Sequence, residues 1–571
     1  MKKITLSAAL LISCFANAQI RVGIESNSQY YIDDDKIKLS QEETDERFRS
    51  NTYIKLDYAI KNFEFGIQGE GYYPKAILNY NPQLQDFNVG TIYARYKNYE
   101  KGVDITAGHM YEQFGSGLAL RFWEDRALGI NNALFGGRVK WNIGDFAQIK
   151  VLGGKQRVGM GFDFSEGLVY GADTEIDISN ILKKDDYVLK FGASFVGRYE
   201  DVTELSPNPS NPDAYRNVPK TTDVLTSRAD YSGQNFNFGV EYAYKTKDVH
   251  VETGDIQSSV SRPGNALLIN TGYNTGKFAV NLNLRRIENF TFYSQRNMQG
   301  NVFNYGMINY VPSLTKQYDH SLQNIYVYQA QPQMIYYLTG VEKQGEIGGQ
   351  FDVFYEADKG TFLGGRTGAS FAVNGSYWAG LKNNISSQII TGEFGEDIEI
   401  VDLSTDFLSF GEKYYSDFAV EYRKPFSEKV STIFSYLNQY YNSLFIVDKP
   451  YHVKAHTVAA EATYFLSDIK SVRLELQHQW ANQDRKNWAG GTIEYVPNTK
   501  WSFFVHDIYN YGSDVENERL HYYTLGGAFT TGATRIAASY GRQRGGMMCV
   551  GGVCRFVPES AGFTLNLTTN F

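Results

Sequence analysis

Apolar and polar residues alternate one by one through the last part of the chain. Phe563, Leu565 and Leu567 are each followed by a Thr or an Asn, and the run ends at Phe571. Side chains on a β-strand point to opposite faces in turn, so a period of two predicts a strand. This strand has one apolar and one polar face.

The same alternation recurs in distant parts of the chain. Further stretches with a period of two lie at residues 278–285, 418–423 and 472–477. A single stretch is weak evidence, because any half-buried antiparallel strand shows it. Many such stretches, with no helical domain between them, predict an all-β chain.

Connections between the predicted strands are short and long in turn. Short ones include residues 61–62, 98–102, 144–145, 232–235, 275–277, 359–360, 425–428, 467–468, 498–499 and 531–533. Long ones include residues 33–49, 74–86, 112–133, 200–223, 289–344, 379–412 and 545–559. Outer-membrane barrels keep this parity, because their periplasmic turns are short and their external loops are long. We predict a transmembrane antiparallel β-barrel of about 24 strands, within a range of about 22 to 26. Residues 324–342 are either a further hairpin or part of a loop.

A barrel of this size needs something to fill its lumen. Wide barrels leave an aqueous channel or hold a plug. Strand-like sequence begins almost at Gln19, so we expect no separate plug domain. The long links 112–133, 289–344 and 379–412 are therefore expected to fold inward and fill the lumen.

The N-terminal end carries an export signal. Residues 1–18 hold two lysines, a short apolar stretch and an Ala-Asn-Ala cleavage site, which together predict a signal peptide. Residues 19–571 would then form a single barrel domain. The alternative is a lipobox ending at Cys14, although Ser13 and Phe15 are unusual neighbours for a lipidated cysteine.

Composition agrees with a barrel in a membrane. Mean hydropathy is −0.38, yet a barrel wall faces lipid with alternate residues only and can cross a membrane at this value. Aromatic residues make up 15% of the chain, which favours strands. We expect the outer membrane of a Gram-negative bacterium, with contacts to lipid and lipopolysaccharide.

The net charge of the chain disfavours one class of binding partner. The net charge of −8 becomes −10 when Lys2 and Lys3 leave with the signal, which disfavours nucleic acid as a partner. The acidic loop at residues 33–46 would bind divalent cations near lipopolysaccharide or would simply be solvated. Phe571, ending an amphipathic strand, resembles the signal read by the barrel-assembly machinery.

Cysteines predict one disulfide. Cys549 and Cys554 flank a four-residue spacer with two glycines in the last long link. Such a spacer can bring the two Cα atoms within bonding range, and an exported protein meets oxidising conditions. Two free thiols are the alternative. A metal site would need more ligands and no His lies nearby, so neither a metal nor a cofactor is predicted.

Motifs for catalysis are not found. The chain has no phosphate loop with its Lys, no G-x-S-x-G and no H-E-x-x-H. His452 and His456 are four residues apart, but in a strand this spacing spans two side-chain periods instead of one helical turn. A Ser/His pair shared between neighbouring strands, as in barrel lipases, remains the alternative to a protein that is not an enzyme.

One segment is too apolar for a solvated loop. Residues 111–129 mix large apolar side chains with charged ones. The charged residues are Glu112, Arg121, Glu124, Asp125 and Arg126. We predict that the segment packs against the lumen wall and pairs its charges there. It would act as a rigid brace or as a constriction that contacts a ligand.

The Tyr-Glu-Gln-Phe-Gly-Ser-Gly-Leu run at 111–118 and the Glu-Asp-Arg at 124–126 resemble an uncharacterised family of Bacteroidota outer-membrane proteins. The loop with both cysteines and the Asn-Ala-Gln junction at 17–19 are similar to that family too. The resemblance implies the barrel fold and its location but no activity.

Two classes of function remain. One is a narrow channel or transporter for small solutes. The other is a non-catalytic structural or accessory subunit of a larger outer-membrane assembly for secretion or protein insertion, which would bring outer-membrane protein partners.

Overall fold

A computed structural model describes most of the chain. The described residues are 18–38, 46–77, 84–201, 218–249, 251–252, 255–256, 261–298, 306–332, 334–336, 341–391, 397–550 and 552–571. The predicted signal peptide therefore lies outside the described residues, except for Ala18. Residues 39–45 of the acidic loop at 33–46 lie outside them as well.

The main sheet has 24 strands, as predicted. Its first strands are β1 (Ala18–Tyr31), β2 (Phe48–Ile60), β3 (Phe63–Lys75), β4 (Gln85–Asn98), β5 (Val103–Met110), β10 (Leu134–Ile143), β11 (Ala147–Arg157) and β12 (Phe164–Asp177). Next come β13 (Val188–Tyr199), β14 (Thr221–Ser232), β15 (Phe236–Asp248), β18 (Arg262–Asn274), β19 (Phe278–Glu288), β22 (Gly345–Ala357), β23 (Ala369–Thr391) and β24 (Asp397–Ser427). The last are β25 (Val430–Asn442), β26 (His452–Ser467), β27 (Lys470–Ala481), β28 (Trp488–Asn498), β29 (Trp501–Asn510), β30 (His521–Thr531), β31 (Thr534–Gln543) and β34 (Ser560–Asn570).

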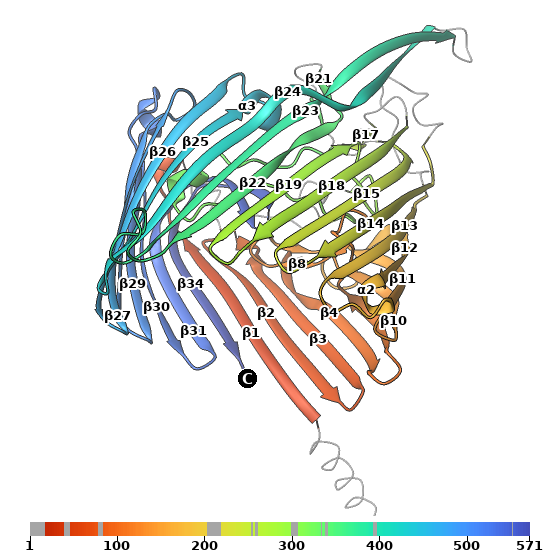
Figure 1. Ribbon diagram of the computed structural model, residues 1–571, viewed down its shortest axis with the longest axis horizontal. Helices are drawn as coiled ribbons and strands as arrows, with labels where there is room; N and C mark the ends of the chain where they lie inside the picture. Colours follow the sequence, from red (N-terminus) through yellow and green to blue (C-terminus); the bar gives the residue numbers. More distant parts are fainter. Residues whose placement is uncertain are drawn as a thin grey trace, which may run out of the picture.

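Pairing of the first and last strands closes the barrel. β1 pairs antiparallel with both β2 and β34, and the two terminal strands lie side by side in Figure 1. Beyond β34, the backbone N–H of Phe571 donates to the carbonyl of Val22 at 2.8 Å. Closure leaves no unpaired sheet edge, which a membrane requires.

Short and long connections alternate as the sequence predicted. One end of the barrel carries the turns and both chain ends, and the other carries the long links (Figure 1). We call them the short-turn end and the long-loop end. Two of the turns are longer than the shortest ones: residues 178–187 include helix α2 (Ile178–Ile181), and residues 358–368 join β22 to β23.

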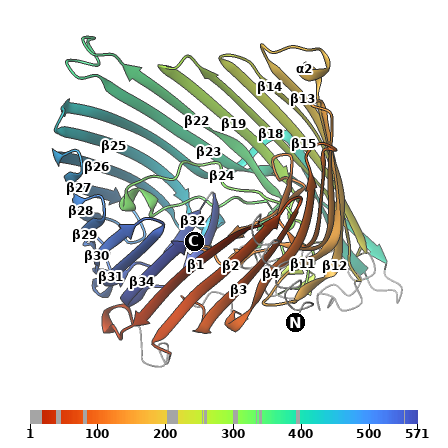
Figure 2. The ribbon, with the colours of Figure 1, turned by 90° about the horizontal axis from the view of Figure 1, so that it is seen from below.

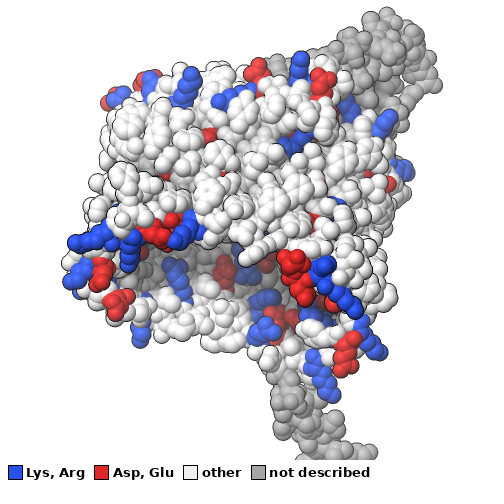
Figure 3. Space-filling model, viewed as in Figure 1, with Lys and Arg blue, Asp and Glu red and all other residues white. Residues whose placement is uncertain are grey.

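The outer face of the wall is apolar. Leu474 and Leu476 of β27 are 44% and 58% exposed, whereas their neighbours Glu475 and Gln477 are buried at 5% each. This is the reverse of a soluble protein and is expected for strands that face lipid outside and a filled lumen inside. Figure 3 shows a band almost free of charged residues between two rims that carry them.

Inward-folding segments of the chain fill the lumen, as predicted. Inside the ring lie small hairpins built from β6 (Glu112–Phe114), β7 (Leu120–Phe122), β8 (Glu124–Asp125), β9 (Ile130–Asn131), β32 (Gly546–Val550) and β33 (Val553–Val557). Residues 289–332 accompany them and include the short 3-10 helix η5 (Ser321–Asn324). In Figure 2, β32 lies within the outline of the ring. Outside the main sheet lie also η1 (Asp35–Ile37), β16 (Val251–Glu252), β17 (Asp255–Ile256), β20 (Met334–Tyr336), β21 (Val341–Lys343), α3 (Ser443–Val447) and η6 (Glu516–Glu518).

The prediction for residues 379–412 was wrong. The described residues of this stretch, 379–391 and 397–412, do not fill the lumen, because they extend β23 and β24 into one long hairpin that projects beyond the wall (Figure 1). Pairing continues from Asn383↔Thr405 to Thr391↔Asp397. We call residues 383–405 the projecting hairpin.

In the described part of the chain, no helix has both the length and the apolar character needed to cross a membrane.

Candidate functional site: the lumen plug

Two inner segments share one apolar core inside the barrel. Together, residues 111–134 and the described parts of 289–332 are called the lumen plug. Phe114, Leu120 and Phe290 are fully buried at 0%, and they join wall residues such as Val196 and Val224 in one cluster. This core explains why the apolar side chains at 111–129 leave water, since burying a large one contributes about 1.5–3 kcal/mol.

Glu112 joins the plug to the wall, as predicted. It accepts hydrogen bonds from Arg138 Nη1 at 2.8 Å and Lys150 Nζ at 3.1 Å. Arg138 is on β10 and Lys150 is on β11. The carboxylate is thus held by cations from two neighbouring wall strands.

Arg126 and Glu124 form a second junction with the wall. Arg126 Nη1 lies 2.6 Å from Glu25 Oε2 on β1, and Nε lies 3.3 Å from Glu124 Oε1. Gln68 of β3 donates to Glu124 at 2.7 Å and accepts from Arg126 at 3.1 Å. The ring of Tyr53 packs under the guanidinium, with its centroid 4.4 Å away.

Asp125 and Arg121 have different roles from the predicted charge pairing. Asp125 accepts from the backbone N–H of Leu128 at 2.8 Å and so closes a turn within the plug. The Arg121 guanidinium stacks on the rings of Tyr310 and Trp123, at 3.8 and 4.9 Å from their centroids. Cation–π contacts therefore hold Arg121 between the two plug segments.

Buried ion pairs that the sequence did not reveal fix the plug more deeply. Arg157 pairs with Glu70, and both side chains are at most 2% exposed. Arg285 pairs with Glu346 with similar burial. Arg157 and Glu70 come from the non-adjacent strands β11 and β3, whereas Arg285 and Glu346 come from the paired strands β19 and β22. Each arginine also donates to a backbone carbonyl of the plug, Arg157 to Asn131 and Arg285 to Pro312.

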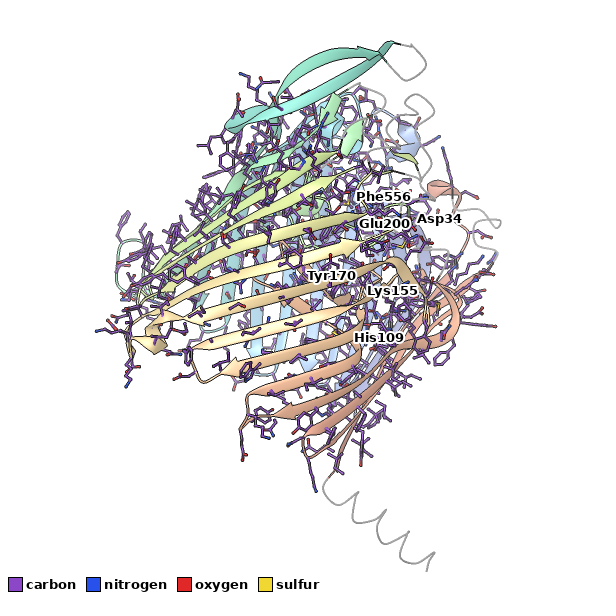
Figure 4. The ribbon with its side chains drawn as sticks, turned by 90° about the vertical axis from the view of Figure 1, so that its right-hand side faces the viewer. Asp34, His109, Lys155, Tyr170, Glu200 and Phe556 are labelled. Atoms are coloured by element: carbon purple, nitrogen blue, oxygen red, sulfur yellow. A yellow bond between two sulfur atoms is a disulfide. The ribbon has the colours of Figure 1, made fainter. Side chains whose placement is uncertain are left out.

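Arg296, in the plug segment at 289–332, likewise forms buried ion pairs with acidic residues of the wall. Its guanidinium pairs with Asp248 at 2.8 Å and with Glu200 at 2.5 Å. Burial acts to lower the pKa of Arg296, but Asp248 and Glu200 outweigh it and raise the pKa. Figure 4 shows Glu200 on the wall above Tyr170 and His109.

The predicted disulfide between Cys549 and Cys554 is present. It links β32 to β33, and the cysteines are 8% and 4% exposed. The hairpin contacts the plug, because Gly552 accepts from the backbone N–H of Ser313 at 2.7 Å. The last long link is thus part of the lumen filling instead of an external loop.

The plug does not reach the short-turn end. On the inner face of β13, the exposed fraction falls from 38% for the side chain of Lys190 to 4% at Ser194 and 0% at Arg198. Glu175 on β12 pairs with Lys190 and is 35% exposed. We call this solvated part of the lumen the vestibule, and the hollow in the lower part of Figure 3 is lined by charges of both signs.

On the opposite wall the exposed fraction of the side chains also falls from the vestibule toward the plug. A cluster of ionisable residues lies along this part of the wall. The side chains of Glu494 and Arg473 are 34% and 29% exposed, whereas the side chain of Glu475 is 7% exposed. His320 of the plug lies beside Glu461 and Glu475. The sequence predicts no metal ligands here, because His320 and these carboxylates are more than a hundred residues apart.

Fold and site together define a transmembrane β-barrel that is plugged by its own loops. The chain belongs to the Family of unknown function (DUF6029), whose model matches residues 1–571. No curated protein matches the chain.

Several solved structures are similar to this chain at low sequence identity. The P pilus usher PapC translocation pore has 7% identity and a TM-score of 0.43, covering 96% of this chain and 99% of that one. The siderophore receptor PirA from Pseudomonas aeruginosa has 8% identity and a TM-score of 0.37, covering 97% and 80%. OccAB3 from Acinetobacter baumannii has 9% identity and a TM-score of 0.34, covering 97% and 99%.

Proposed function

We propose that this protein is a narrow channel or transporter for small solutes in the outer membrane of a Gram-negative bacterium, closed at rest by its own plug. The apolar outer band supports a place in lipid. The observation that carries the proposal is the sharp change inside the lumen, from a solvated vestibule of mixed charge to a buried plug. A vestibule that admits water and ions is expected of a solute pathway.

Closure at rest follows from how the plug is fastened. Its charged residues bind wall strands on different sides of the barrel, from β1 at Glu25 to β11 at Lys150. Passage of a solute then requires part of the plug to move. The ion pairs at the vestibule border, such as Glu112 with Arg138, would open before those that are fully buried, because solvent stabilises separated charges.

Planar-bilayer recording tests this proposal. The intact protein should show small or no conductance, and deleting residues 118–131 should enlarge it. Large and stable pores from the intact protein would contradict closure by the plug. Heat-modifiable mobility in a gel would confirm that the deletion variant is still a folded barrel.

A second function is favoured by the projecting hairpin. It extends beyond the wall, and Leu408 and Phe410 at its base are 73% and 52% exposed. Exposed apolar residues on a projection are common where another protein binds. An accessory subunit of an outer-membrane assembly would therefore use this hairpin.

Isolation from native membranes in mild detergent tests the second function. A stoichiometric partner that is retained by the intact protein and lost without residues 386–402 would support it. Recovery of the barrel alone from such membranes would count against it.

A further inference from the structure

A histidine of the plug faces two carboxylates of the wall at the border with the vestibule. His320 directly precedes η5, and Glu461 and Glu475 are register partners on β26 and β27. One ligand atom from each of the three residues lies within 4.8 Å of the others. His320 Nε2 and Glu461 Oε2 are 3.7 Å apart, which suits two ligands of one small cation better than a hydrogen bond.

The imidazole is oriented as a metal ligand would be. His320 Nδ1 lies 3.1 Å from Gln323 Oε1, and the Gln323 amide is turned this way because its Nε2 donates to Ser435 at 3.1 Å. Nδ1 is therefore the nitrogen that carries the proton. Metal-binding histidines usually donate their other N–H to an oxygen in this manner.

The remaining nitrogen is buried without a hydrogen bond. His320 is 3% exposed, and its Nε2 has no hydrogen-bond partner among the described residues. A buried polar atom in this state destabilises the fold, because it has lost its hydrogen bond to water. Since the lone pair points toward Glu461 and Glu475, a cation held between them would remove this destabilisation.

The charges around the histidine leave room for a divalent cation. Among the described residues, Glu461, Glu475 and Glu494 form ion pairs with one guanidinium, that of Arg473, so this group carries two net negative charges when His320 is neutral. Arg423 also lies near Glu461, but it pairs with Asp319 and Glu421. Arg473 Nη1 lies 3.0 Å from both Glu461 and Glu475, and Nη2 lies 3.0 Å from Glu494. Arg473 can thus keep Glu494 as its partner while the other two carboxylates bind a metal.

Another histidine borders the cluster without entering it. His506 on β29 lies 2.9 Å, at Nδ1, from the Thr492 hydroxyl, and Thr492 also donates to Glu475 at 3.3 Å. Thr492 therefore orients the Glu475 carboxylate. Ions reach the cluster from the vestibule, where Glu494 and Arg473 are partly exposed.

We propose that His320, Glu461 and Glu475 bind one divalent first-row transition-metal ion such as Zn²⁺. Imidazole nitrogen and carboxylate oxygen are both ligand types that zinc binds, and three protein ligands leave a fourth position for water from the vestibule. Ca²⁺ and Mg²⁺ prefer oxygen ligands alone, so the histidine selects against them. The bound ion ties the second plug segment to β26 and β27, whether or not the lumen conducts solutes.

Metal analysis of the purified barrel tests the site. Protein stripped with a chelator and dialysed against Zn²⁺ should retain one equivalent at this site. His320→Ala and Glu475→Gln should each weaken binding by at least about 10-fold. His456→Ala is the matched control, because His456 is an exposed wall residue that hydrogen-bonds to Tyr436. The affinity of this variant for Zn²⁺ should be unchanged.

X-ray absorption of the zinc-loaded, unmutated protein gives a readout that does not depend on folding of variants. The expected first shell contains one imidazole nitrogen and oxygen atoms. A shell without imidazole, a stripped protein that takes up no Zn²⁺, or unchanged affinity in His320→Ala would each overturn the proposal.

Discussion

Two long stretches of similar appearance take opposite courses in this molecule. Residues 289–332 turn into the lumen, whereas the projecting hairpin at 383–405 leaves the wall. Phe290 and Phe292 in the first are buried at 0% and 1%. Leu408, at the base of the second, is 73% exposed.

Backbone hydrogen bonding explains the difference. In the projecting hairpin each strand satisfies the backbone of the other, so the wall supports the hairpin only at its base, through Arg286 and Glu288 of β19. In the plug, side chains of the wall donate hydrogen bonds to backbone carbonyls. Lys245 Nζ donates to the Thr291 carbonyl at 2.6 Å, and Arg198 Nη1 donates to the Tyr293 carbonyl at 2.8 Å. The plug therefore depends on the barrel along its length, whereas the hairpin contacts the barrel at its base.

Breaking the buried ion pair between Arg157 on β11 and Glu70 on β3, beside the plug residue Asn131, should have the largest effect on stability. Arg157→Met leaves Glu70 buried without its cation, which should destabilise the barrel by about 3–5 kcal/mol in denaturant unfolding. Leu408→Ala beside the hairpin should change stability by no more than about 0.5 kcal/mol.

The double variant Glu70→Met, Arg157→Met is the control for this prediction. It removes both charges, so it should recover much of the loss. Equal effects of Arg157→Met and Leu408→Ala would contradict the contrast between the two regions.

Removing the disulfide should have a smaller effect that is local to the plug. Changing Cys549 and Cys554 to Ser frees a short loop, worth about 2 kcal/mol from loop entropy alone. Because β32 and β33 contact Ser313, protease should cut residues 546–557 faster in the double Ser variant. Cleavage of the projecting hairpin should keep its rate, and faster cleavage there would show that the two regions are not independent.

The smallest effect is expected at the base of the projecting hairpin. Arg286 donates to the Phe407 carbonyl at 2.6 Å and to the Thr405 hydroxyl at 3.1 Å. Arg286→Ala should loosen the hairpin by about 1 kcal/mol per lost hydrogen bond, seen as faster amide exchange in 397–410. Global unfolding of the barrel should hardly shift, and a shift as large as that of Arg157→Met would contradict this reading.

Local patterns in the sequence were enough to predict the wall. Alternation at 472–477 placed Leu474 and Leu476 outside, and the parity of connections predicted the 24 strands that the structure has. The disulfide was predictable too, because both of its cysteines lie in one short stretch. These features depend on neighbours in sequence, which a single chain displays.

The course of residues 379–412 could have been predicted better. Ile398 and Ile400 alternate with acidic residues, and this period of two signals a strand. The length of the stretch alone favours a place in the lumen, but its period of two is the stronger signal.

Contacts inside the lumen could not be predicted. The partners of Arg157, Arg296 and His320 come from strands or loops far away in sequence, and only barrel closure fixes which of them meet. Arg121 shows the same limit, since its aromatic partner Tyr310 belongs to the other plug segment. Charge and apolar content predicted that residues 111–129 turn inward, but not which wall residues they bind.

Single-channel conductance of three matched proteins tests the central claim most directly. Intact protein, a variant without plug residues 118–131 and a variant without hairpin residues 386–402 would be compared in the same bilayer. The plug account predicts small or no conductance from the intact protein and the hairpin variant, and a clearly larger conductance from the plug variant. Large pores from the intact protein, or opening on removal of the hairpin alone, would contradict it.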